Sequence, residues 1–475
     1  MNEQLTPAGA RRIRDVMRAD PMIYCEKILG VKPWSLQQDI LRSVVRNKVT
    51  RVKSCHSAGK SFIGGCAVSW FLPTQPDGIV ITTAPTARQV RGILWKEIRG
   101  RVAGAKIKIG PVPKTQSWNL GPEWFAIGFT APEHDSDRFQ GWHSKSGRIL
   151  VVADEAAGIS QSIWDGGISS IISGEHSRLL MLGNPTDPSG EFAKSFHDPE
   201  PGRFTIDAFQ TPNFTAFGIT LDDIRNGTWE SKITGPLPYP GLVDPYWVAQ
   251  RWRRWGESSD YFRSRVLAQF PQSASDTAIP MQLIERARLR AADKSPKSQA
   301  TLRRLGVDVA RFGADESVIA LRSDRLVSIV ETHHGLDTMS LAAVVVSAIE
   351  RTGATETNVD VIGVGAGVVD RLNQLRIAGI SGVNVAEKAS DDERFGNLKA
   401  ELWWNLRDAL ERDECDLEIS DDEAAELSAP KYKIQAGRTF IEDKAETKKR
   451  IGKSPDSADA IVLAWSRSSS QVVWF

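Results

Sequence analysis

A short loop at residues 54–61 places a glycine, a lysine and a hydroxyl in an order that suits phosphate chemistry. Its sequence is Ser-Cys-His-Ser-Ala-Gly-Lys-Ser, and a mostly apolar run that ends at Pro73 follows it. A nucleoside triphosphate needs backbone N–H groups around its β-phosphate, an ammonium at its γ-phosphate and a hydroxyl on its Mg²⁺. The loop offers all three, and a helix after it would point its positive N-terminus at the phosphates. The residues expected to contact ATP are Ser57, Ala58, Gly59, Lys60 and Ser61.

Two adjacent carboxylates follow a buried-type apolar run at residues 149–153, which predicts a strand. Asp154 would hold Mg²⁺ through water, and Glu155 would polarise the water that attacks the γ-phosphate. Capping of the next helix is the alternative role, and the loop upstream favours the catalytic one. A further strand at 179–182 leads to Asn184, whose amide is placed to sense the γ-phosphate.

Two features near the loop leave alternatives open. Ser54 stands where the usual G-x-x-x-x-G-K-[ST] pattern has its first glycine, so a chance turn is an alternative to a phosphate loop. Upstream, Gln37 precedes an amphipathic run, and we expect it, in preference to Gln38, to bind the edge of adenine. Two solvated glutamines on a helix face are the other interpretation.

The second half of the chain carries four aspartates that we expect to meet at one point. Asp308 and Asp360 lie within strand-like apolar runs, where a buried carboxylate needs a cation or a donor. Asp456 and Asp459 lie three residues apart, on one face near the start of a predicted helix. Asp459 directly precedes an apolar run, so we expect it to point at the sheet, with Asp456 one turn nearer the helix start. Two carboxylates about 4 Å apart repel by roughly 4 kcal/mol at an effective dielectric constant near 20. The cluster therefore predicts a binding site for Mg²⁺ or Mn²⁺.

Composition limits the class of protein. The chain has 475 residues, enough for two or three domains, and its 60 Lys and Arg residues nearly balance its 59 Asp and Glu residues. Contacts with nucleic acid must therefore come from local basic patches, such as residues 251–254 and 444–453. The four scattered cysteines argue against a disulfide framework or a zinc site. No run reaches the ~20 apolar residues needed to span a bilayer, so we expect no membrane contact.

Alternating strand-like and helical runs predict an α/β protein of two main domains. We expect a nucleotide-binding core with a mainly parallel sheet and an N-terminal arm at residues 1–210, and a lid at 211–275. A linker at 276–300 would lead to the second domain at 301–475, which opens with an antiparallel meander.

The ordered set of motifs resembles the large terminase subunit of tailed bacteriophages, and the likeness extends across most of the chain. The motifs are the Gln37 region, the loop at 54–61, Thr83–Thr86, Arg138–Gly141, Asp154-Glu155 and Gly183–Pro185. A D-x-x-D-A sequence at 456–460 resembles the last motif of RNase H-like nucleases. The likeness to these nucleases implies a site for two Mg²⁺ or Mn²⁺ ions that hydrolyses phosphodiesters, with Asp308 as the shared ligand. The resemblance implies a P-loop ATPase domain followed by an RNase H-like nuclease domain. By the same resemblance Arg138 matches an arginine finger that acts on a neighbouring subunit's ATP, with Arg148 and Arg178 as rivals.

The resemblance also implies a role and partners. ATP hydrolysis would drive double-stranded DNA through a portal protein into a procapsid, and the nuclease would cut concatemeric DNA. The expected partners include a small terminase subunit and further copies of the chain in a ring, pentameric by resemblance, in the host cell cytoplasm. A DNA-repair helicase-nuclease is an alternative, although no further helicase motif follows Pro185. A structural packaging adaptor without catalysis is another, against which Lys60, Glu155 and Asp308 argue.

Overall fold

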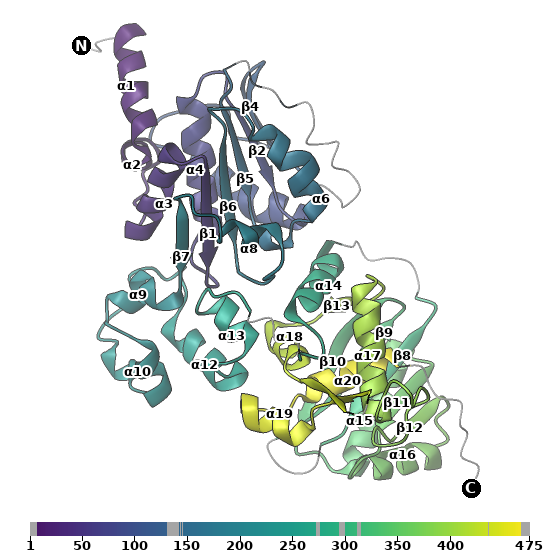
Figure 1. Cartoon of the computed structure of the whole chain (residues 1–475). Coiled ribbons are helices and arrows are strands. Elements are labelled where there is room, and N and C mark those ends of the chain that lie inside the picture. Colours follow the sequence, from purple (N-terminus) through teal and green to yellow (C-terminus); the bar gives the residue numbers. More distant parts are fainter. Residues whose placement is uncertain are drawn as a thin grey trace. The chain divides into compact units, whose positions relative to one another are not determined.

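The computed structural model describes residues 7–130, 142, 144, 146–271, 276–293, 300–310, 315–435 and 437–466. The described residues form two compact units, which Figure 1 shows with their helices and strands. Unit 1 comprises Met1–Gln250 with Arg263–Pro271, and unit 2 comprises Arg251–Phe262 with Gln272–Phe475. The domain boundaries predicted at residues 210, 275 and 300 stay predictions.

The described strands of unit 1 form one seven-stranded sheet. They are β1 (Val49–Ser54), β2 (Ile79–Thr83), β3 (Ser117–Gly121), β4 (Trp124–Gly128), β5 (Ile149–Ala153), β6 (Arg178–Gly183) and β7 (Arg203–Ile206). Their order is β3-β4-β2-β5-β6-β1-β7, in which only the β3 and β4 pair is antiparallel. The C-terminal ends of parallel strands share one edge, where ligands bind in open α/β sheets. Residues that follow β1, β5 and β6 therefore meet there.

Helices cover both faces of this sheet (Figure 1). Strand alternation sends Ile79, Ile81 and Val151 to the face that packs against Trp164 and Phe192. Helix α4, which follows the loop, lies against β2, β4, β5 and β6. The helices up to residue 265 are α1 (Pro7–Ala19), α2 (Pro21–Tyr24), α3 (Ser35–Arg46), α4 (Lys60–Thr74), α5 (Trp95–Ala103), α6 (Gln161–Ile163), α7 (Ser169–Ile171), α8 (Glu191–Ser195), α9 (Pro212–Thr215), α10 (Leu221–Asn226), α11 (Trp229–Lys232), α12 (Pro245–Trp255) and α13 (Asp260–Arg265).

The main sheet of unit 2 has six described strands in the order β12-β11-β8-β9-β10-β13. They are β8 (Arg303–Asp308), β9 (Glu316–Ser323), β10 (Leu326–His334), β11 (Glu356–Asp360), β12 (Ile380–Val383) and β13 (Asp416–Glu418), and β14 (Tyr432–Gln435) and β15 (Arg438–Ile441) form a separate hairpin. Strands β8, β9 and β10 form an antiparallel meander. Strand β11 pairs in parallel with β8, and β12 pairs in parallel with β11. This is the strand arrangement of an RNase H-like domain.

The two faces of β8 pack against different helices. Leu305 and Val307 pack against α15 and α16 in one apolar cluster. Gly306 and Asp308 belong to the opposite face, where α20 lies against β8 and β9. The helices of this unit after residue 280 are α14 (Met281–Asp293), α15 (Thr338–Thr352), α16 (Gly365–Gln374), α17 (Leu398–Glu411), α18 (Asp421–Ser428), α19 (Lys444–Ile451) and α20 (Asp456–Trp465).

The predicted fold class is confirmed, since a mainly parallel α/β unit precedes an RNase H-like unit. The antiparallel meander that the sequence predicts after residue 301 is confirmed as β8, β9 and β10. None of the helices in the described segments combines the length and the apolar character that crossing a bilayer requires.

Candidate active sites

The loop after β1 turns sharply and leads straight into α4. Ser57 and Gly59 both have positive φ angles, 51° and 85°, and α4 begins at Lys60. Left-handed residues in a turn direct successive N–H groups to one side, where they can bind an anion. The φ of 85° favours glycine at position 59, and an added Cβ there would also lie 2.6 Å from Nε2 of Gln37, so the glutamine side chain would have to shift. The loop therefore has the backbone of a phosphate site.

Gln37 is buried beside this loop. Its Oε1 accepts a hydrogen bond from the backbone N–H of Trp34 at 3.3 Å, and its Nε2 faces Gly59. Gln38 instead donates to the carbonyl of Pro33 at 2.8 Å. Of the two glutamines, Gln37 is thus the one shown against the loop, and its contact with adenine stays a prediction.

The ends of β5 and β6 bring three predicted residues to Lys60 and Ser61. The Lys60 ammonium donates to Oδ1 of Asn184 at 2.9 Å and lies 3.4 Å from the Glu155 carboxylate. Nδ2 of Asn184 donates to the carbonyl of Ser54 at 2.6 Å, so the amide spans from the lysine to the loop. Ser61 Oγ and Asp154 lie 3.5 Å apart, which places hydroxyl and carboxylate together as a Mg²⁺ site needs.

The two carboxylates differ in their proton affinity. Burial raises the pKa of Asp154 to about 7, and the charge of Glu155 adds to the rise. Burial also opposes ionisation of Glu155, but Lys60, Arg265 and His56 outweigh it and lower the pKa of Glu155. Glu155 has a φ of 49°, a strained backbone conformation of the kind that collects at functional sites. Glu155 is therefore held ionised, as a residue that accepts a proton from water must be.

Arg265 and Trp247 lie at this site, and the sequence analysis predicted neither of them. Arg265, the last residue of α13, donates to Oδ1 of Asn184 at 3.2 Å. The ring of His56 stacks on Trp247 with 6.0 Å between centroids. Arg265 and Trp247 lie more than 180 residues beyond the loop in sequence, so no local pattern links them to it. The proposed arginine finger, Arg138, lies outside the described residues.

The second site gathers three of the four predicted aspartates around one lysine. The Lys444 ammonium lies 2.8 Å from Asp308, 2.9 Å from Asp456 and 3.2 Å from Asp459. Lys444 begins α19, and the sequence analysis placed it in a basic patch for DNA instead. In the same helix Lys448 pairs with Asp315, so this patch is partly neutralised within the unit.

Electrostatics in this cluster follow from burial. Burial raises the pKa of Asp308 well above its usual range despite Lys444, and Asp459 and Asp456 raise it further. Burial alone would lower the pKa of Lys444. The three carboxylates outweigh the effect of burial and raise this pKa. One ammonium thus balances only part of the negative charge, and the cluster keeps an excess that favours further cations.

Asp456 and Asp459, the two aspartates at the start of α20, are buried to different depths. The sequence analysis placed Asp459 nearer the sheet than Asp456, and this order is wrong. The Asp456 side chain is 1% exposed and that of Asp459 is 17% exposed. Asp456 is the deeper of the two and accepts a hydrogen bond from the backbone N–H of Glu316 at 2.9 Å.

Asp360 is the last residue of β11. It accepts a hydrogen bond from the backbone N–H of Ile362 at 2.9 Å, and burial and the charge of Asp459 raise its pKa.

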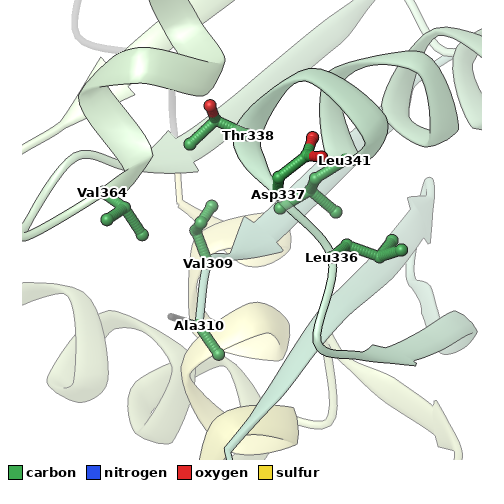
Figure 2. Close-up of a pocket in the computed structure, with 7 residues that line it drawn as sticks. All are labelled: Val309, Ala310, Leu336, Asp337, Thr338, Leu341 and Val364. Atoms are coloured by element: carbon green, nitrogen blue, oxygen red, sulfur yellow. The ribbon is translucent and has the colours of Figure 1, made fainter. Parts of the chain in front are cut away.

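A cavity of about 340 Å³ opens beside the end of β8 (Figure 2). It is lined by Val309, Ala310, Leu336, Asp337, Thr338, Leu341 and Val364. Its carboxylate, Asp337, already caps α15 by accepting from the N–H of Ser340. The cavity is therefore mainly apolar and is not the cation site.

The fold and the sites define a class of protein, in which a mainly parallel α/β domain with a P-loop-like turn precedes an RNase H-like domain with an acidic centre. A probable terminase large subunit of Enterobacteria phage P7 is 26% identical over 196 residues. The match covers 39% of this chain and 39% of the relative, so the matched region spans well under half of that protein. No protein-family model matches the sequence. The predicted resemblance to large terminase subunits is confirmed by this relative.

Solved structures with low overall similarity carry the same name. A variant nuclease domain of the large terminase subunit of bacterial virus Sf6, with manganese, is 19% identical. It covers 40% of this chain and 99% of that domain, with a TM-score of 0.35. The large terminase of a thermophilic bacteriophage, solved in complex with ADP, is 12% identical, covers 90% of this chain and 98% of that one, and has a TM-score of 0.39.

Proposed function

We propose that this chain is a viral DNA-packaging motor subunit that hydrolyses ATP and cuts DNA. The observation that carries the proposal is that each unit gathers its motif residues around one buried or half-buried lysine. In unit 1, Lys60 lies between Glu155 and Asn184 at the sheet edge. In unit 2, Lys444 lies among the acidic residues that end β8 and begin α20.

In the ATPase reaction Lys60 and the loop N–H groups would bind the terminal phosphates. Glu155 would accept a proton from the water that attacks the γ-phosphorus, and the bond to the β–γ bridging oxygen would break to release ADP and phosphate. Ser61 and Asp154 would hold Mg²⁺. The 3.4 Å ion pair of Lys60 with Glu155 suits a resting state, because Lys60 must leave Glu155 to bind phosphate.

In the nuclease reaction Asp308, Asp360, Asp456 and Asp459 would hold two divalent cations. Their carboxylate oxygens are the ligands that Mg²⁺ and Mn²⁺ prefer, and three of them already surround one positive charge. No group of three His, Cys, Asp or Glu side chains in the described residues is arranged to hold a metal ion as it stands. Lys444 occupies that space, so cation binding requires its ammonium to move. Bound cations would activate water and stabilise the leaving 3′ oxygen.

The partners follow from the same proposal. Double-stranded DNA would be moved by the ATPase and cut by the nuclease, and a portal protein, a small terminase subunit and a procapsid would complete the packaging machine. A homo-oligomeric ring, pentameric by resemblance, would let Arg138 of one copy act on the ATP of the next. The site of action would be the host cell cytoplasm.

ATP hydrolysis with and without double-stranded DNA tests the motor half. Lys60→Ala should abolish hydrolysis, because the γ-phosphate loses its ammonium. Lys48→Ala is the matched control, since Lys48 is exposed and donates to the carbonyl of Ser173 at 3.4 Å. Equal turnover by Lys60→Ala and the unmodified chain would refute an ATPase at this loop.

Calorimetric titration with Mn²⁺ tests the nuclease half without relying on activity. Asp308→Asn should remove the heat of binding at the acidic centre, because Asp308 is the proposed shared ligand of both cations. Asp315→Asn is the control, since Asp315 is half-buried and pairs with Lys448 instead of Lys444. Unchanged Mn²⁺ binding by Asp308→Asn would contradict the assignment.

A further inference from the structure

Arg265 is tied to the ATPase site at two points. Its side chain, in a residue 7% exposed, donates from Nη1 to Oδ1 of Asn184 at 3.2 Å. Its backbone carbonyl accepts from the N–H of His56, inside the loop, at 2.7 Å. A residue from the predicted lid at 211–275 thus contacts both the phosphate loop and the end of β6.

The segment that carries Arg265 is itself fixed on the ATPase unit. The carbonyl of Val266 accepts from the N–H of Ala208 at 2.9 Å, and Ala268 is fully buried with a φ of 51°. Buried residues keep a left-handed conformation only where their surroundings impose it. The backbone that carries the Arg265 side chain is therefore held in place on unit 1.

Two cations share one neutral oxygen at this point. Oδ1 of Asn184 accepts from Lys60 at 2.9 Å as well as from Arg265. An amide oxygen offers partial charge only, and the ionised Glu155 carboxylate balances one of the two cations. The two side chains together therefore bring positive charge to the place where the loop would hold a terminal phosphate. A γ-phosphate that drew Lys60 away would leave Arg265 as the donor that keeps Asn184 in place.

We propose that Arg265 is a positioning residue for ATP hydrolysis, which holds Asn184 when Lys60 moves to the γ-phosphate. Asn184 in turn keeps its hydrogen bond to the Ser54 carbonyl, so the loop and the end of β6 stay in register during the reaction. The same movement releases Glu155 from Lys60 to act on water. Arg265 therefore serves the chemical step and contributes little to ATP affinity. The inference rests on the proposed ATPase function.

The test compares kcat, KM and nucleotide affinity in Arg265 variants. Arg265→Ala should lower kcat by on the order of 10- to 100-fold, the effect of a misplaced catalytic group. KM and the Kd of a fluorescent ADP analogue should change less than about threefold, and Arg265→Lys should recover part of kcat. Arg225→Ala is the control, because Arg225 is exposed and pairs with Asp222 in its own short helix.

A double-mutant cycle separates action through Asn184 from direct action on phosphate. If Arg265 acts through Asn184, Asn184→Ala and the double variant should have the same kcat. Multiplied losses in the double variant, or an Arg265→Ala enzyme with unchanged kcat, would overturn the inference. A loss of ADP affinity together with a lower melting temperature would also overturn it, since that pattern indicates a structural role. If Lys60→Ala retains hydrolysis, the proposed function itself fails, which is a different result.

Discussion

Replacing Gly306 by alanine should disable the nuclease by moving one helix. Gly306 lies two residues before Asp308 on β8, and its α-carbon packs directly on α20. An added Cβ would lie 2.2 Å from the amide nitrogen of Ala464 and 2.3 Å from the carbonyl oxygen of Ala460. Both are backbone atoms, which cannot rotate away, so the helix must withdraw.

The size of the effect follows from those contacts. Ordinary Cβ contacts begin at 3.4 Å, so α20 must move by about 1 Å relative to β8. Overpacking of this kind costs roughly 1–3 kcal/mol of stability. The same movement displaces Asp456 and Asp459 from Asp308, and a misplacement of about 1 Å can lower a rate on the order of 100-fold.

The assay measures Mg²⁺-dependent cutting of double-stranded DNA beside ATP hydrolysis by the same preparation. Gly306→Ala should lose cutting and keep ATP hydrolysis, because the loop belongs to the other unit. Gly367→Ala is the matched control, since its added Cβ would meet Thr338 no closer than 3.5 Å. A Gly306→Ala enzyme that cuts DNA within twofold of the unmodified chain would refute the argument that this contact sets the spacing of the carboxylates.

Three further predictions concern unit 2. Burial raises the pKa of Glu426 to about 7. The stability that this carboxyl group contributes is therefore fully present below the pKa it has in the unfolded chain, and is lost as the pH rises through 7. Glu426→Gln should therefore flatten the fall in unfolding free energy between pH 5 and 7.5, by up to roughly 3 kcal/mol, in urea titrations. Lys444→Ala should lower the melting temperature without metal and enlarge the rise that Mn²⁺ produces, because the ammonium no longer competes for the carboxylates. An equal Mn²⁺ effect in both proteins would contradict this. Asp422→Ala should cost roughly 1–3 kcal/mol in urea unfolding, because Arg251 and Arg254 both donate to this carboxylate, and an unchanged midpoint would show that these pairs are not stabilising.

The fold and most of the site could be predicted because their signals are local. Apolar runs that lead to Glu155 and Asn184 indicate neighbouring parallel strands, and the shared edge of such strands brings those residues to Lys60 without knowledge of tertiary structure. Asp308 and the helix pair were likewise predicted from strand and helix patterns.

The residues that were missed depend on distant contacts. Lys444 lies 136 positions from Asp308, and its surrounding basic run is typical of a DNA-binding surface. Arg265 lies 81 positions from Asn184, in a segment that no motif marks. The relative depth of Asp456 and Asp459 was also mispredicted, because it is set by the backbone of Glu316, at the start of β9.

A crossed measurement of both activities tests the central claim most directly. ATP hydrolysis and Mg²⁺-dependent DNA cutting would be measured on the same preparations of the unmodified chain, Lys60→Ala and Asp308→Asn. We predict that Lys60→Ala loses hydrolysis and keeps cutting, and that Asp308→Asn loses cutting and keeps hydrolysis. Retention of both activities by either variant, once each is shown to be folded, would contradict the claim that this chain joins two separate catalytic sites.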